Sequence, residues 1–442
     1  MKDRIVLNVV LILGFCVNLF AQGSENSTIN PQSFVEKTNI NLYPSTPYQM
    51  EGAGYNGVDV TTFKRYKEVV FMPKGVGNVT DELNTLIDKL SKAGGGKIII
   101  SKGNYIIKEV VLKSNIQIII ETGVNIVMDN GKSGKQMLFE IGTEENMSCV
   151  ENVRLIGLGS PENRPKLILN KYVNTFYRAI DLGYAKNVLI ENFTVVDHLT
   201  KGAAIAFNPV KINANSANIP ENITVSNVSL TGGSIGYGLV QTNVGENILL
   251  KNLYCQGGMT CRIESHTGRR YDVGVDNIVI KNVVSQNGKA AVLLQPHSVE
   301  NGRILVDGAT SVGSTWTLFI KEGFVSKESK RKVKGSFAAS STFKNITLIS
   351  TDSTATLSYK NFKYVPDSLK GFYKNPDFKP VKNDANYQVE NGEFSAESAV
   401  VGASIAAIFI DATYPLNLPT ETEIILTGKI ANRLKILKTT KY

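Results

Sequence analysis

Four copies of one six-residue pattern run through the middle of this chain: Asn187-Val-Leu-Ile-Glu-Asn192, Asn222-Ile-Thr-Val-Ser-Asn227, Asn247-Ile-Leu-Leu-Lys-Asn252 and Asn277-Ile-Val-Ile-Lys-Asn282. Looser copies begin at Asn115, Asn152 and Asn345. The clear copies start 35, 25 and 30 residues apart, which is too short for a helix in each repeat and suits three short strands joined by turns. Repeats of this kind bury their apolar faces only by stacking on one another. The pattern predicts an all-β solenoid, a parallel β-helix.

Each Asn of the pattern falls where a turn meets a strand. Stacked Asn side chains can hydrogen-bond the amides of the next coil, which would otherwise be buried without partners. We therefore interpret these Asn residues as structural.

The segments on either side of the repeats have other patterns. Apolar residues recur at helical spacing before the first coil, at Leu83, Leu86, Ile87 and Leu90. Thr80 or Asp81 can cap this helix and Gly94 can end it, so we expect a helix that closes the N-terminal end of the solenoid. The irregular residues around 358–391 lack alternation and predict an excursion from the solenoid, placed as a wall or lid beside a cleft or as a C-terminal cap.

The first residues predict export. Basic residues at the start are followed by an apolar run from Ile5 to Phe20 and by the small Ala21, which is typical of a secretory signal peptide over residues 1–22. Residues 23–442 then form a single domain, and the sequence predicts no membrane span. Cys16 raises the alternative of a lipoprotein at the cell surface, although Phe15 is bulky where a small residue is expected.

The charge of the chain points to an anionic partner. Its 442 residues carry a formal net charge of +9, which favours a polyanion. An exported protein meets acidic or sulfated polysaccharide more often than nucleic acid, and we expect a monomer. Without the leader the three cysteines have no metal-ligand spacing, so neither a disulfide scaffold nor a zinc site is predicted.

The repeat also predicts a polar cluster. Counting from the second Asn of each pattern puts Tyr237 level with Arg262, and His297 beside His266. Glu264 lies between Arg262 and His266 with the same parity, so these three side chains should leave one face. The whole predicted cluster comprises Tyr237, Gln241, Arg262, Glu264, His266, Gln295 and His297.

A carboxyl group beside imidazoles and an arginine suits general acid chemistry at a glycosidic oxygen. Poor solvation can raise the pKa of Glu264, whereas Arg262 opposes that shift or binds a substrate anion instead. The sequence leaves these alternatives open. For Glu264 by itself, a solvated strand carboxylate paired with Arg262 is an equally simple interpretation.

The cluster and its surroundings resemble the iota-carrageenases of glycoside hydrolase family 82. The likeness runs from about residue 94 to His297 and is strongest in Gly236-Tyr-Gly-Leu-Val-Gln241, Thr260-Cys-Arg-Ile-Glu-Ser-His-Thr-Gly268 and Pro296-His297. The resemblance implies a right-handed β-helix that cleaves β-1,4 linkages of iota-carrageenan endolytically and with inversion. Family members can bind calcium, sodium or chloride, and no required cofactor or metal site is expected here.

The resemblance also implies roles for residues. Glu264 corresponds to the general acid, and Gln241 and His297 to residues that hold the water and tune the site. Tyr237, with Gly236 before it, and Arg262 correspond to substrate-binding positions. The family has an Asp two residues after the acid as general base, whereas this chain has His266, a residue whose neutral ring can take a proton from water.

Further basic residues near the cluster can bind sulfate esters, namely Arg269, Arg270, Lys289 and Lys321. Asp272 and Asp276 are weaker alternatives to His266 as base. Two other functions fit the same fold. One is a polysaccharide lyase, which leaves an ultraviolet-absorbing double bond, and the other is a non-catalytic solenoid that only binds a polyanion.

Overall fold

The computed structural model describes residues 55–74, 77–129, 134–145, 148–169, 176–373, 387–388, 394–395, 399–430 and 432–439. The predicted signal peptide over residues 1–22, including Cys16, lies outside the described residues. Part of the predicted excursion at 358–391 does so as well.

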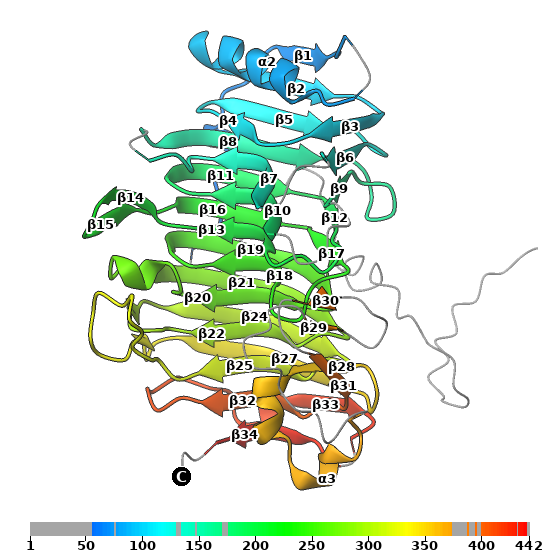
Figure 1. Ribbon diagram of the computed structural model, residues 1–442, viewed down its shortest axis with the longest axis vertical. Coiled ribbons are helices and arrows are strands. Elements are labelled where there is room, and N and C mark those ends of the chain that lie inside the picture. The colour runs from blue at the N-terminus through cyan, green and yellow to red at the C-terminus, as the bar shows by residue number, and fades with distance from the viewer. Residues whose placement is uncertain are drawn as a thin grey trace, which may run out of the picture.

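Two long sheets of parallel strands wind around one elongated core (Figure 1). The first sheet begins with β1 (Glu68–Phe71), β2 (Gly96–Ile100), β5 (Ile116–Ile120), β8 (Val150–Gly157), β11 (Ala185–Glu191) and β16 (Glu221–Ser226). It continues through β19 (Gly245–Gln256), β21 (Val275–Gln286), β24 (Ile304–Val312), β27 (Thr342–Ser350) and β33 (Ile425–Gly428). It turns a corner along β19 and returns through β17 (Ser229–Thr231), β12 (Thr194–Val196), β9 (Lys166–Ile168), β6 (Asn125–Met128) and β3 (Asn104–Ile107).

The second sheet forms the remaining face of each coil. Its ten strands are β4 (Val110–Leu112), β7 (Lys135–Ile141), β10 (Phe176–Leu182), β13 (Ala203–Phe207), β18 (Gly238–Thr242), β20 (Met259–Glu264), β22 (Ala290–Gln295), β25 (Trp316–Lys321), β32 (Ala406–Asp411) and β34 (Leu434–Lys438). Each coil therefore contributes strands to three faces. The fold is the right-handed parallel β-helix that the sequence predicted.

Short hairpins, strand pairs and helices lie outside the two long sheets. They are the hairpin of β14 (Val210–Asn213) and β15 (Ser216–Asn218), and the pairs β23 (Glu300–Asn301) with β26 (Ser336–Phe337), β28 (Ala355–Ser358) with β31 (Ala399–Gly402), and β29 (Tyr387–Gln388) with β30 (Phe394–Ser395). The helices are η1 (Val60–Thr62), α2 (Thr80–Lys92), η2 (Gly268–Arg270), η3 (Tyr359–Tyr364), α3 (Asp367–Lys370) and η4 (Glu421–Glu423).

The apolar residues of the Asn pattern form the core. Four of them lie in register on successive coils and are fully buried, namely Val188, Ile223, Ile248 and Ile278, and Ile304 continues the stack on the next coil. Each one packs between equivalent residues of the coils above and below. This one-dimensional stacking is why the chain can exceed the size of an ordinary single core.

The Asn residues of the pattern form ladders at the corners of the coils. Asn252 donates its side-chain amide to Asn227 Oδ1 at 2.9 Å, and Asn282 donates to Asn252 Oδ1 at 3.4 Å. All the Asn residues of the pattern have positive φ, and Asn252 has φ of 53°. Asn tolerates this left-handed conformation because its side chain hydrogen-bonds locally. The predicted structural role of these residues is confirmed.

We expect Asn252→Ala to lower the stability of the solenoid by about 1–3 kcal/mol, because it strains the left-handed backbone and removes a rung of the ladder. Asn252→Gly should cost less, since glycine adopts positive φ freely and loses only the hydrogen bonds. Thermal unfolding of the two variants beside the parent checks the order. Equal stability of the Ala variant and the parent would contradict the ladder's role.

Helix α2 closes the N-terminal end of the solenoid (Figure 1) and buries Leu83 and Ile87. The predicted cap is wrong. Thr80 is the first helical residue, and its hydroxyl accepts from the Lys108 amide of a neighbouring coil. Asn78 instead accepts from the Thr80 amide at 2.9 Å. The helix ends at the predicted glycines, where Gly94 has φ of 93°.

The described part of the excursion packs on the outer face of the second sheet, near the C-terminal end. Leu357, Val365 and Leu369 are buried against Trp316 and other aromatic residues of β25 and β32. The described part of this segment leaves the solenoid, and its helix η3 stands beside the outward-facing side chains of β22 and β25. It is therefore positioned as a wall.

Candidate active site

Three neighbouring strands of the second sheet, β18, β20 and β22, and the turns next to them carry the predicted cluster. Along β20, Cys261 and Ile263 point into the core and are fully buried. Arg262 and Glu264 alternate with them, so they leave the outer face. Glu264 is in register with Gln295 of the next coil. The predicted parity of the cluster is confirmed.

The predicted register is wrong in one place. The structure pairs Arg262 with Gln241, whereas counting had placed Arg262 level with Tyr237. Six residues, 232–237, separate β17 from β18, but only 257–258 separate β19 from β20. Tyr237 therefore lies at the end of a longer loop, with its ring 5.1 Å from the Arg262 guanidinium carbon. His266 and His297 are neighbours as predicted, with ring centroids 5.3 Å apart.

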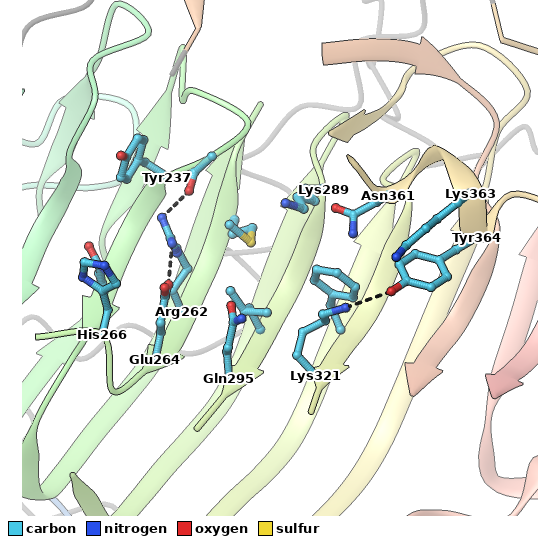
Figure 2. Close-up of a pocket in the computed structure, with 15 residues that line it drawn as sticks. Tyr237, Arg262, Glu264, His266, Lys289, Gln295, Lys321, Asn361, Lys363 and Tyr364 are labelled. Carbon is cyan, nitrogen blue, oxygen red and sulfur yellow. Dashed lines mark hydrogen bonds and ion pairs between the residues drawn. The ribbon is translucent and has the colours of Figure 1, made fainter. Parts of the chain in front are cut away.

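A pocket of about 490 Å³ opens on this face. Figure 2 shows Glu264 and His266 toward one end, and Lys289, Asn361 and Lys363 toward the other. The residues that line it are Gly236, Tyr237, Gln241, Met259, Arg262, Glu264, His266, Lys289, Leu293, Gln295, Phe319, Lys321, Asn361, Lys363 and Tyr364. The pocket crosses several coils, so its long direction follows the solenoid axis.

Glu264 is held on both oxygens. Its Oε2 accepts from Arg262 Nη2, and its Oε1 lies 3.2 Å from His297 Nε2. Arg262 is fixed in turn by donating Nη1 to the carbonyl of Gly236. Only 6% of Glu264 is exposed, so the carboxyl group meets solvent only through the pocket.

Opposing effects act on the pKa of Glu264. Burial is the largest and would raise the pKa, but the Arg262 charge and the His297 hydrogen bond together outweigh it and hold the pKa below its usual range. Glu264 is therefore ionised in the ligand-free protein. The structure resolves the alternatives that the sequence left open, because Arg262 pairs with Glu264.

His297 lies behind Glu264, away from the pocket lining, and is only 2% exposed. Its Nδ1 is buried and has no hydrogen-bond partner among the described residues. The hydrogen bond to the carboxylate requires a proton on Nε2, because a carboxylate oxygen only accepts. His297 is thus a donor that orients Glu264.

His266 lies at the rim of the pocket and is exposed. Desolvation beside the pocket wall lowers its pKa to about 4, and the nearby cations Arg269 and Arg262 act in the same direction against Glu264. The ring is therefore neutral at mildly acidic and neutral pH. A neutral imidazole can accept a proton from a water molecule in the pocket.

The far wall contains residues that the sequence did not predict. Asn361, Lys363 and Tyr364 come from η3 and line the same pocket as Glu264. Lys321, which the sequence did select, pairs with Asp411 at 2.6 Å. The segment around η3 has no repeat, so no register in the sequence could have placed its side chains.

The two arginines of the η2 turn, Arg269 and Arg270, do not line the pocket. Arg269 donates to the His266 carbonyl and to Glu328 Oε2, the latter at 2.7 Å. Arg270 also pairs with Glu328, at 3.0 Å. These contacts position the loop that carries His266.

Asp272 and Asp276 lie outside the pocket lining as well. Asp276 accepts from the backbone amides of Asn277 and Arg303, so its carboxylate has a structural contact. Within the described ranges, no group of three or more His, Cys, Asp or Glu side chains is arranged to hold a metal ion. No helix in the described part of the chain has the length and apolar character needed to cross a membrane.

Known proteins of similar sequence are iota-carrageenases. One from Zobellia galactanivorans is 30% identical over 277 residues, which is 60% of this chain and 53% of that protein. Another from Alteromonas macleodii is 31% identical over 264 residues, or 56% of this chain and 51% of that protein. The chain thus spans about half the length of these curated relatives. No protein-family model matches the chain.

Solved iota-carrageenase structures have a similar fold. An iota-carrageenase complexed to iota-carrageenan fragments superposes with a TM-score of 0.70 at 20% identity, over 86% of this chain and 92% of that one. A family GH82 iota-carrageenase from A. fortis, solved in the absence of chloride ions, gives 0.70 at 22% identity, over 90% and 94%. In sequence and in its right-handed β-helix fold, the chain resembles iota-carrageenase.

Proposed function

We propose that the protein is a secreted, endo-acting glycoside hydrolase that cleaves the β-1,4 linkages of iota-carrageenan with inversion. The observation that carries this proposal is the buried Glu264 carboxyl, held between Arg262 and His297 on the outward face of a solenoid that resembles iota-carrageenase. A pocket that crosses several coils suits a segment of an extended polymer.

Glu264 acts as the general acid in this proposal, and it must therefore gain a proton when substrate binds. A bound polysaccharide displaces water from the pocket, which favours the neutral carboxyl. A sulfate ester near Arg262 competes with Glu264 for the guanidinium and has the same effect. The proton then passes from Glu264 to the glycosidic oxygen as the bond breaks.

His266 acts as the general base. Inverting hydrolases usually space two carboxyl groups around the attacking water. Among the described residues that line this pocket, Glu264 is the one carboxylate, and His266 is the neutral group two residues further along. Its ring takes the proton of the water that attacks the anomeric carbon.

We expect His266→Ala to lower kcat by about 10²–10⁴-fold, the usual contribution of a general base. In the parent, activity should fall as the pH drops through about 4, because His266 becomes protonated there. His266→Asp should recover part of the activity, since a carboxylate also accepts a proton. Initial rates of reducing-end release against pH check this, with His198→Ala as the control. A parent-like rate in His266→Ala would remove His266 from the mechanism.

The proposed function itself is tested on iota-, kappa- and lambda-carrageenan, agar and pectin, with reducing ends and ultraviolet absorbance measured together. We expect reducing ends from iota-carrageenan without new absorbance, and a product anomer opposite to that of the substrate by proton NMR. Activity on pectin alone, with a rise in absorbance, would overturn the proposal in favour of a lyase. Binding of sulfated polysaccharide without any turnover would favour a binding module.

A further inference from the structure

The end of the pocket farther from Glu264 brings together polar groups from two parts of the chain. Lys289 precedes β22 in the solenoid, whereas Asn361 and Lys363 belong to η3. A hydrogen bond of 2.7 Å from Lys289 Nζ to Ser358 Oγ joins the two parts. In Figure 2 the three side chains face the same space.

Asn361 is the most informative of these residues. It is only 4% exposed, and its Oδ1 is buried without a hydrogen-bond partner among the described residues. A buried amide in this state carries a desolvation cost that a bound partner would remove. Its oxygen can accept from a sugar hydroxyl and its nitrogen can donate to a sulfate oxygen.

The charge at this end is positive. Lys363 is exposed, and within the described ranges it forms no ion pair, although its ammonium group lies 4.9 Å from the Tyr364 ring centroid. Lys289 is 4% exposed and donates to the Ser358 hydroxyl. The cations Arg262 and Lys321 each contact a carboxylate, whereas Lys363 has no ion pair within the described ranges. An anion therefore gains most at the end of the pocket that holds Lys363.

The strand register indicates how far Lys289 and η3 lie from Glu264, where the linkage is cleaved. Glu264 lies on β20, Lys289 immediately precedes the adjacent β22, and η3 packs beside β25, one coil further. Neighbouring strands are about 4.8 Å apart, so this end lies roughly one to two strand spacings from Glu264 along the solenoid axis. A neighbouring sugar unit of an axially bound polymer would reach it.

We propose that Lys289, Asn361 and Lys363 form a second subsite, which binds the sulfate ester of a sugar unit next to the cleaved linkage on the C-terminal side of Glu264. The inference rests on the proposed function for the identity of the polymer. Lys289 and Lys363 supply the cations, Asn361 supplies the directed hydrogen bonds, and the excursion that holds η3 contributes substrate recognition as well as packing.

Calorimetry on the full chain tests the subsite. Glu264→Gln serves as the parent, so that the sugar is not consumed, and the probes are iota-carrageenan oligosaccharides before and after chemical desulfation. We expect Lys363→Met and Asn361→Asp, each added to this parent, to weaken binding of a sulfated hexasaccharide about tenfold or more. The same changes should leave a disaccharide and the desulfated hexasaccharide unaffected. Added salt should reduce the difference between Lys363→Met and the parent.

Lys166→Met is the matched control, because Lys166 is exposed on β9, away from the pocket lining. Thermal unfolding checks that each variant is folded. Because Lys363 is exposed, Lys363→Met should not disturb the fold. Parent-like binding of the sulfated hexasaccharide by both pocket variants would overturn the subsite while leaving hydrolysis by the unmodified protein intact. Loss of binding in these variants, in a protein that hydrolyses no galactan, would support the subsite and overturn the proposed function.

Discussion

Glu264→Gln is expected to abolish turnover of iota-carrageenan, with a loss in kcat of about 10²–10⁴-fold, because glutamine has no proton to give to the leaving oxygen. The amide keeps the shape of the side chain, and its single oxygen can still accept from either Arg262 or His297, although not from both at once. Binding of the polysaccharide should therefore persist. Reducing-end release at saturating substrate, beside a binding measurement, separates the two effects.

The same change removes the charge opposite Arg262, which is itself buried. We expect a modest fall in thermal stability, so circular dichroism at the assay temperature is needed to show that the variant is folded. Glu246→Gln on β19 is the control, since Glu246 is exposed and outside the pocket lining. A galactoside with a dinitrophenol leaving group needs no acid and should be cleaved with a smaller loss. Undiminished turnover of iota-carrageenan by Glu264→Gln would rule out this residue as the acid.

Arg262→Met should destabilise the protein by about 3–5 kcal/mol at neutral pH, because it leaves the buried Glu264 carboxylate without its main counter-charge. It should also reduce activity, since the acid loses its orienting partner and the pocket loses a cation that faces substrate. Denaturant unfolding at several pH values and steady-state rates measure the two effects. Arg262→Lys retains the charge and should recover part of the stability.

The pH dependence gives this variant a distinctive signature. In the parent, Arg262 and His297 hold the pKa of Glu264 below its unfolded value. The ionised group then stabilises the fold above the unfolded pKa, and this contribution disappears as the pH falls through the folded pKa. Without Arg262, burial should dominate and raise the pKa, so that stability declines as the pH rises above the unfolded value.

Above about pH 4.5, the ordinary pKa of a glutamate, the contribution of Glu264 should therefore stay constant in the parent and fall in the variant. The parent gains nothing further from ionisation of Glu264 there, whereas the variant becomes less stable toward neutrality. Arg303→Met is a suitable control, because Arg303 contacts Asn277 and lies outside the pocket lining. Parallel pH curves for the parent and Arg262→Met would mean that the ion pair does not control the charge of Glu264.

The repeat predicts which residues of the site share one face of the solenoid. Because strand parity is fixed at two residues, Arg262, Glu264 and His266 could be assigned to one outward face from their spacing alone. The predicted alignment of Tyr237 with Arg262 was wrong because the loop before β18 is longer than the loop before β20. A difference in loop length changes the register between coils. The prediction that Thr80 caps α2 was wrong because the Thr80 hydroxyl accepts a hydrogen bond from the Lys108 amide of a neighbouring coil.

The sequence by itself determined the β-helix, its buried stacks and the face that carries Glu264, since these depend on short periodic contacts between neighbouring coils. Tertiary structure alone decided the protonation state of Glu264, which depends on the distances to Arg262 and His297. It also decided that Asn361 and Lys363, about a hundred residues away in the chain, complete the pocket. Those residues lie in a segment without a repeat, so only the packing of its apolar side chains on β25 and β32 could place them.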